Sequence, residues 1–246
     1  MGYNIISKCF ERRVIFTARY QTILFDADQT LLDFHRSERE ALISALTQMR
    51  IQPSEEMIQK YSEINLFTWK RLEKGEITKK ELRTVRFADF CAYYELELDI
   101  EKLADQYLTS LATQGFLLGN ALKVCQTLAA VCRLYIITNG IAAVQHGRFD
   151  RLPLKPYFQN IFISDEIGAE KPSKAFFDSV KAQIPQFDPA TTLVVGDSLT
   201  SDIAGGIAAG LDTCWLNAAG KASPSDLPIT YTIKKLEEVI PLVLGT

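Results

Sequence analysis

Short apolar runs alternate along this chain with longer stretches that have helical spacing. Residues 22–25, 134–137 and 192–195 are apolar and rich in β-branched side chains, which is typical of buried strands in a parallel sheet. The same alternation predicts further strands at 161–164, 212–216 and 230–233, and helices at 121–130, 142–151, 174–183 and 234–240. We therefore expect an α/β fold with a doubly wound, mainly parallel, Rossmann-like sheet.

The alternation is interrupted between residues 34 and 114, where we find only helical spacing. Helices are expected there at 38–50, 54–73, 79–94 and 100–111. Because this segment follows the first strand directly, we expect an all-helical cap at 34–114 over a catalytic core formed by 21–33 and 115–246. Residues 1–20, in which basic side chains separate short apolar pieces, remain an unassigned N-terminal extension.

Polar side chains with complementary chemistry follow the predicted strands. Ligands of such folds bind outside the carboxyl ends of the strands, so these side chains are expected to face a common crevice. They are Asp26 and Asp28 after the first strand, Thr138 and Asn139 after the second, Asp197 and Asp202 after the third, and Lys171 just before the helix at 174–183.

Each of these residues also has a purely structural interpretation. The Asp26 and Asp28 pair suits a solvated turn, Thr138 suits a helix N-cap, and Lys171 suits an exposed surface. Asp197 and Asp202 suit a pair that caps the helix expected near Leu199. The agreement of all these placements along the chain favours a functional site.

The amino-acid sequence around these positions resembles motifs I to IV of the haloacid dehalogenase (HAD) superfamily of aspartate-dependent phosphohydrolases. Residues 25–34 (FDADQTLLDF), 138–140 (TNG) and 196–203 (GDSLTSDI) resemble more narrowly the pyrimidine 5′-nucleotidases that act on nucleoside monophosphates. Lys171 matches the lysine of the third motif. The likeness runs from about Gln21 to the C-terminus.

The resemblance implies a catalytic pair and a metal site. Asp26 would attack phosphorus to give an aspartyl phosphate, and Asp28 would act first as general acid and then as general base. Mg²⁺ is the implied cofactor, because hard oxygen ligands suit it. It would be held by Asp26, the backbone carbonyl of Asp28 and Asp197, with Asp202 further from the ion.

The remaining motif residues would bind the phosphate group. Thr138, the amide of Asn139 and the ammonium of Lys171 are expected to contact the phosphoryl oxygens. In the cap, cationic and aromatic side chains at helical spacing offer contacts to the rest of the substrate, although packing between cap helices is the favoured explanation of the aromatic ones. These cap residues are Trp69, Arg83, Arg86, Phe87 and Phe90.

Composition excludes some classes of partner. The 246-residue chain has a net charge of −3 and no basic footprint, so we expect no nucleic acid polymer as a partner. No apolar stretch is long enough for a membrane span, so no membrane partner is expected. The five cysteines have no metal-ligand spacing and indicate free thiols in a reducing cytoplasm. The sequence does not distinguish a monomer from a homodimer.

The function expected from these observations is a magnesium-dependent phosphomonoesterase acting on a small phosphorylated metabolite, most plausibly a pyrimidine nucleoside 5′-monophosphate. Open alternatives are a phosphatase of phosphoglycolate or a sugar phosphate, a phosphosugar mutase, and a 2-haloacid dehalogenase. The dehalogenase needs neither Mg²⁺ nor an acid at Asp28. A binding protein without turnover is a further alternative, since fold does not fix function, but no motif residue is missing.

Overall fold

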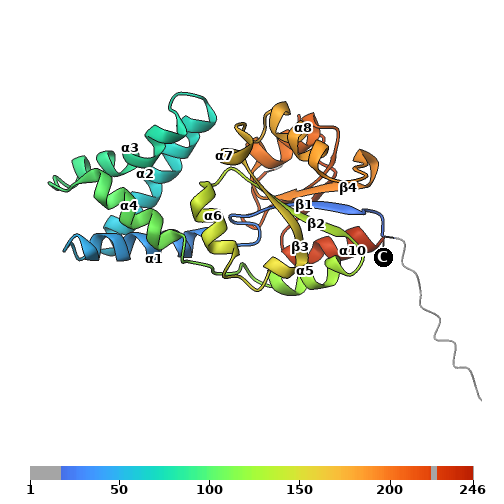
Figure 1. Ribbon diagram of the computed structural model, residues 1–246, viewed down its shortest axis with the longest axis horizontal. Helices are drawn as coiled ribbons and strands as arrows, with labels where there is room; N and C mark the ends of the chain where they lie inside the picture. The colour runs from blue at the N-terminus through green and yellow to red at the C-terminus, as the bar shows by residue number, and fades with distance from the viewer. Residues whose placement is uncertain (1–17, 223–225, 246) are drawn as a thin grey trace, which may run out of the picture.

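The fold consists of a parallel sheet with helices on both faces and a separate bundle of helices beside it (Figure 1). A computed structural model describes residues 18–222 and 226–245. The six strands pair in parallel in the order β3-β2-β1-β4-β5-β6. Their bounds are Thr22–Asp26 (β1), Arg133–Thr138 (β2), Phe158–Ile163 (β3), Thr192–Gly196 (β4), Asp212–Leu216 (β5) and Tyr231–Ile233 (β6). This confirms the predicted fold class.

The central strand β1 is buried on both faces, which explains its continuous apolar run. Ile23 and Phe25 pack with α5 (Ala121–Ala129) and α10 (Val239–Leu244) on one face. Leu24 points to the opposite face and packs with α8 (Lys174–Gln183). Because strand side chains alternate, one short strand anchors both helical layers and fixes the position of its last residue, Asp26.

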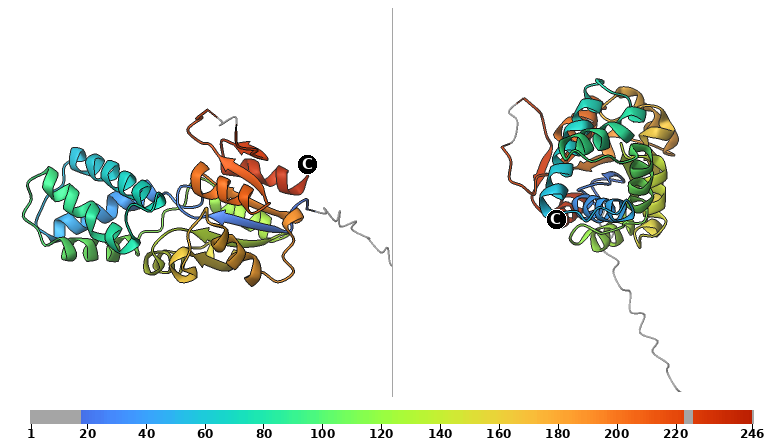
Figure 2. Two further views of the ribbon diagram at one scale, coloured as in Figure 1. Left: turned by 90° about the horizontal axis from the view of Figure 1, so that it is seen from above. Right: turned by 90° about the vertical axis from the view of Figure 1, so that its left-hand side faces the viewer.

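Four helices form the second part of the structure, which we call the helical unit: α1 (Phe34–Gln48), α2 (Glu55–Glu73), α3 (Lys79–Tyr93) and α4 (Ile100–Leu111). The unit has an apolar core of its own, in which Tyr61, Phe87, Phe90 and Tyr107 are fully buried. Packing is therefore the role of Phe87 and Phe90. The unit extends away from the sheet, as the left-hand view of Figure 2 shows.

The two chain segments that join the helical unit to the core run side by side. The backbone N–H of Asp33 donates to the carbonyl of Phe116 at 2.9 Å, and that of Leu118 donates to Leu31 at 2.9 Å. The chain thus leaves the core and re-enters it at one place, close to the carboxyl end of β1. This places the helical unit opposite the polar residues that follow the strands.

Several boundaries differ from the sequence predictions for local reasons. Helix α1 begins at Phe34 rather than 38, because Asp33 Oδ1 caps it by accepting from the N–H of Arg36 at 3.0 Å. Strand β3 starts three residues earlier than expected, and its predicted last residue, Ser164, instead begins the short helix α7 (Ser164–Ile167). The alternation of the sequence marks burial, whereas these ends depend on individual caps and turns.

The last helices also differ from their predictions. The helix expected at 234–240 is a 3₁₀ turn at Leu236–Glu238 followed by α10, whose first turn accommodates Pro241 because no intrahelical N–H bond is needed there. The helix expected near Leu199 starts as a π-helical turn at Leu199–Ile203 and continues as α9 (Ala204–Ala208). Helix α6 spans Ala142–Phe149, and further 3₁₀ turns lie at Lys155–Tyr157 and Pro189–Thr191.

The cysteines of the described residues agree with the thiol prediction. Cys91, Cys125, Cys132 and Cys214 are free and buried, and burial raises the pKa of the Cys125 thiol to about 12. Cys9 and most of the N-terminal extension lie outside the described residues. Within the described ranges, no helix combines the length and apolar character that a membrane crossing requires.

Candidate active site

A cleft of about 240 Å³ lies at the carboxyl ends of the central strands. Strands β1, β2 and β4 are neighbours in the sheet, so the residues that end or follow them come together. Residues of α1 and α2 line the opposite side of the cleft. All seven residues singled out from the sequence line it: Asp26, Asp28, Thr138, Asn139, Lys171, Asp197 and Asp202.

Lys171 is the central cation of the cleft. Its Nζ donates to Asp26 Oδ1 at 2.7 Å, to Asp202 Oδ1 at 2.7 Å and to the carbonyl of Ile137 at 2.9 Å. The side chain is almost fully buried, which disfavours its charge, but the carboxylates of Asp202 and Asp26 outweigh this and raise its pKa. Lys171 is therefore a buried structural cation and not the exposed surface lysine of the alternative interpretation.

The loop that carries Lys171 is fastened to the loop after β2. The side chain of Asn139 makes two reciprocal bonds, donating from Nδ2 to the carbonyl of Lys171 and accepting the Lys171 N–H at Oδ1, both at 2.8 Å. Both polar atoms of the Asn139 side chain are thus bonded to the backbone of Lys171, and the side chain positions the lysine. The backbone amide of Asn139 is left as the donor towards the cleft.

Three carboxylates crowd beside Lys171. Asp26, Asp197 and Asp202 each offer an oxygen, and these oxygens lie within 4.8 Å of one another. Burial, reinforced by the charge of Asp202, raises the pKa of Asp26 well above its usual range and that of Asp197 to about 7. One lysine does not neutralise three acids, two of them buried and one half-buried, so a divalent cation with oxygen ligands fits this set.

Asp202 is held firmly within this cluster. Its Oδ1 accepts from Lys171 and its Oδ2 accepts from the backbone N–H of Ser198 at 3.0 Å. A Cβ on Gly196 would lie 2.3 Å from Asp202 Oδ2, so only glycine at the end of β4 allows this approach. With both oxygens engaged by the protein, Asp202 supports the cluster from behind.

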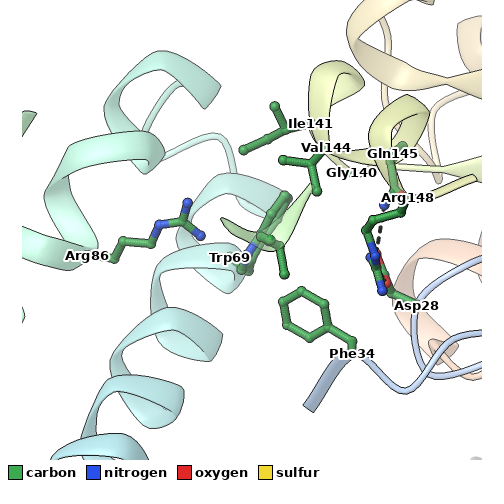
Figure 3. Close-up of a pocket in the computed structure, with 10 residues that line it drawn as sticks. Asp28, Phe34, Trp69, Arg86, Gly140, Ile141, Val144, Gln145 and Arg148 are labelled. Carbon is green, nitrogen blue, oxygen red and sulfur yellow. Dashed lines mark hydrogen bonds and ion pairs between the residues drawn. The ribbon is translucent and has the colours of Figure 1, made fainter. Parts of the chain in front are cut away.

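Asp28 lies in the cleft but its carboxylate has different partners. Gln145 Nε2 donates to its Oδ2 at 2.8 Å, and Arg148 Nη1 donates to its Oδ1 at 2.6 Å (Figure 3). The fully buried Arg148 also donates from Nε to the carbonyl of Gln114 at 3.0 Å and from Nη2 to Ser37 Oγ at 3.4 Å. Arg148 therefore connects Asp28 to helix α1 and to the segment that follows α4.

Thr138 ends β2 and is not a helix cap. Helix α6 has Ile141 as its N-cap residue, while Thr138 Oγ1 accepts from the N–H of Gly140 at 3.0 Å. Gln145 Nε2 approaches the same oxygen at 3.3 Å, and a Cβ on Gly140 would lie 2.1 Å from that nitrogen. The turn at Gly140 thus brings α6 close enough for one glutamine to contact both Thr138 and Asp28.

Gln145 and Arg148 were not predicted as site residues. Only a helix was predicted at 142–151, and the one signal in its sequence is that these two polar residues, three positions apart, lie on one helix face. Both are buried, at 1% and 0% exposure, despite their polarity. A buried arginine requires an acceptor, but its burial becomes visible only in the structure.

The chain is similar to known phosphatases and hydrolases over nearly its full length. The model of the haloacid dehalogenase-like hydrolases matches residues 20–210. Pyrimidine 5′-nucleotidase PynA of Streptococcus pneumoniae is 36% identical, with 90% of this chain and 94% of that protein covered. Pyrimidine 5′-nucleotidase YjjG of Escherichia coli is 33% identical, with 92% and 98% covered.

Solved structures extend the likeness to the fold. The HAD-hydrolase YfnB of Bacillus subtilis, whose crystal structure contains magnesium, has a TM-score of 0.88 at 38% identity and covers 93% of this chain and 100% of its own. L-2-haloacid dehalogenase from Xanthobacter autotrophicus shares the fold with a TM-score of 0.72 at 19% identity, with 92% and 99% covered. Because the family model matches residues 20–210 and PynA and YjjG are 36% and 33% identical, the chain belongs to the haloacid dehalogenase-like hydrolases and is an enzyme of that family.

Proposed function

We propose that this enzyme is a magnesium-dependent phosphomonoesterase that hydrolyses pyrimidine nucleoside 5′-monophosphates through an aspartyl-phosphate intermediate. The observation that carries the proposal is that four carboxylates and one buried lysine line a single cleft. Three of these carboxylates, those of Asp26, Asp197 and Asp202, form a cluster that fits a metal ion. The similarity to PynA and YjjG supports the choice of substrate class.

Asp26 is the proposed nucleophile. Lys171 holds its Oδ1, while Oδ2 makes no hydrogen bond to any described residue and remains available for attack on phosphorus. The ammonium opposes the effect of burial on the pKa of this carboxylate and reduces its repulsion with the incoming phosphate. Attack forms the bond between Oδ2 and phosphorus as the bond to the leaving oxygen breaks, and water then hydrolyses the acyl phosphate.

Asp28 is the proposed general acid and base. In this structure both of its oxygens are held by Gln145 and Arg148 on α6. To protonate the leaving oxygen, the carboxylate must give up the contact with Arg148 and acquire a proton. Since Arg148 also contacts α1 and the segment that follows α4, we propose that substrate binding shifts the helical unit and releases Asp28.

The residues of the acid cluster fit Mg²⁺. We propose that it is held by side-chain oxygens of Asp26 and Asp197 and by the backbone carbonyl of Asp28, with Asp202 behind them. When bound, the ion supplies positive charge that offsets the negative charge of nucleophile and phosphate. The hydroxyl of Thr138 and the backbone amide of Asn139 are proposed donors to the phosphoryl oxygens. The ammonium of Lys171 is the third proposed donor, and it must exchange one of its three protein acceptors for a phosphoryl oxygen when substrate binds.

We further propose that residues 34–114 act as the cap of the active site and that 21–33 with 115–246 form the catalytic core. Trp69 and Phe34, which come from the helical unit, line the cleft together with the core residues. A cap in this position would exclude water from the aspartyl phosphate until the leaving group departs. A cytoplasmic location agrees with a nucleotide substrate and with the free thiols.

The test is phosphate release from purified enzyme against a panel of UMP, dUMP, dTMP, purine monophosphates, sugar phosphates and phosphoglycolate. Each substrate is measured with Mg²⁺ and with a chelator. We expect magnesium-dependent turnover with the highest kcat/KM for pyrimidine monophosphates. Preference for a sugar phosphate or phosphoglycolate would keep the mechanism and reject the substrate, and turnover that survives the chelator would reject the metal.

A further inference from the structure

A second, smaller cavity lies between the helical unit and the core, directly beside the active-site cleft (Figure 3). It shares four lining residues with the cleft, namely Asp28, Phe34, Trp69 and Gly140, so the two spaces adjoin. Its volume of about 30 Å³ admits an oxygen-sized group and is far too small for a ring. A substrate held in the cleft could therefore insert a single polar atom here.

The distinctive residue of this cavity is Arg86, which α3 contributes. Its side chain is 1% exposed, and Nη1 donates to Asn65 Oδ1 at 2.9 Å. Within the described ranges, Nε and Nη2 have no hydrogen-bond partner. Figure 3 shows the guanidinium directed towards the cavity and Trp69. Buried donors without an acceptor are costly to the fold, which indicates that a ligand or water supplies one.

The guanidinium is held in place by contacts from three helices. Asn65 donates from Nδ2 to Glu38 Oε1 at 2.6 Å, and Ser62 Oγ donates to Glu38 Oε2 at 2.7 Å. Asn65 thus stands between the buried carboxylate and Arg86, and the ring of Tyr107 lies 5.0 Å from the guanidinium carbon. Arg86 is fixed before any ligand arrives, while two of its three nitrogens remain free to donate.

The surroundings restrict which ligand atom suits Arg86. The neighbouring cation Arg148 is already engaged with Asp28, Gln114 and Ser37. The half-buried rings of Trp69 and Phe34 line the passage from the cleft to the cavity. A flat ring between these aromatics with one exocyclic acceptor oxygen matches this combination, whereas a phosphate group, with several oxygens, exceeds the space.

We propose that Arg86 recognises the leaving group of the substrate by donating from Nε and Nη2 to an exocyclic carbonyl oxygen of a pyrimidine base, with Trp69 and Phe34 beside the ring. This inference rests on the proposed function and adds a base-binding residue to it. Arg86 takes no part in phosphate transfer. Its contribution depends on the presence of the base, and this dependence separates base recognition from a structural role.

The experiment compares Arg86→Met with wild type on UMP and on two substrates without a base, 2-deoxyribose 5-phosphate and p-nitrophenyl phosphate. Loss of charged donors to a carbonyl is expected to lower kcat/KM for UMP by about 10- to 100-fold, mainly through KM. The base-free substrates should change by less than about threefold. Arg86→Lys, which keeps a donor, should recover part of the loss for UMP but not all of it.

A matched control comes from the same helix. Contrary to the expectation from the sequence, Arg83 lines neither the cleft nor the cavity and instead pairs with Asp105 and Glu101. Arg83→Met should therefore leave kcat/KM unchanged for every substrate. Thermal unfolding of each variant measures folding separately, and the ratio of UMP to base-free activity within one preparation cancels any misfolded fraction.

Two results would overturn the inference: an equal loss for all substrates, which would make Arg86 a structural residue, or no loss for UMP. Failure of the proposed function gives a different result. If the wild-type enzyme hydrolyses the base-free substrates but no nucleotide, the proposed nucleotidase function is wrong. Base recognition by Arg86 is then rejected as well, before any variant is made.

Discussion

Two buried cations, Lys171 in the cleft and Arg86 in the adjoining cavity, have contrasting surroundings. The Lys171 ammonium has three acceptors, all supplied by the protein. Two of the three Arg86 guanidinium nitrogens have none among the described residues. The core side is therefore complete before substrate binds, while the helical side lacks acceptors that a substrate can supply. The proposals above therefore place reaction chemistry and substrate choice in different parts of the fold.

Arg148 occupies an intermediate position in this comparison. All three of its guanidinium nitrogens are hydrogen-bonded, yet its partners belong to the cleft, to α1 and to the segment that follows α4. Unlike Arg86, it has a protein partner on each of its guanidinium nitrogens. Its contacts instead connect the carboxylate of Asp28 to the position of the helical unit, so the two sides of the cleft are not mechanically independent.

The largest expected effect is on the core side. Asp26→Asn keeps the size of the side chain but removes the nucleophile, so hydrolysis of UMP should fall by at least about 10⁴-fold. Phosphate release in single-turnover conditions checks this, with thermal unfolding as the control for folding. Retained turnover in this variant would mean that another group attacks phosphorus. The core side could then no longer be credited with the nucleophile.

A second prediction concerns stability and compares the two cations directly. Lys171→Met leaves buried carboxylates without their partner and should cost about 3–5 kcal/mol of unfolding free energy. Arg86→Met removes a side chain whose donors are largely unpaired and should cost at most about 1 kcal/mol. Urea unfolding without Mg²⁺ measures both. Similar losses for the two variants would show that the difference in hydrogen bonding has no energetic counterpart.

The smallest expected effect is the response of stability to pH and Mg²⁺. Burial raises the pKa of Asp197 from 3.8 to about 7. The folded protein then binds this proton more tightly than the unfolded chain. The contribution of Asp197 to the free energy of unfolding is therefore greatest below pH 3.8 and is lost as pH rises through 7. Mg²⁺ binds the ionised acids, so it should raise Tm by about 3–6 °C at pH 7.5 and by much less at pH 5.

Scanning fluorimetry with Mg²⁺ or chelator, at matched ionic strength, measures this response. The Asp197→Asn variant should lose most of the gain at pH 7.5. A gain of the same size at both pH values would show that protons do not compete with the metal for this cluster.

The sheet and the residues at its strand ends were predictable because burial and spacing are local properties of the sequence. The apolar run at β1 and the acid at its end, Asp26, are visible without knowledge of any contact. The partners of Asp28 were not, because Gln145 and Arg148 lie 117 and 120 residues away in sequence. The path from Glu38 through Asn65 to Arg86 likewise depends on how three helices pack, which spacing within one helix does not specify.

The adjacent connections at Leu31–Asp33 and 116–118 have an evolutionary consequence. Backbone hydrogen bonds between these connections hold the two ends of the inserted helices together. The number of inserted residues therefore does not change how the chain leaves and re-enters the core. Evolution can then lengthen, trim or replace the inserted helices without disturbing the strand order. A protein engineer could do the same by exchanging residues 34–114 for those of a relative and retaining the chemistry of the core.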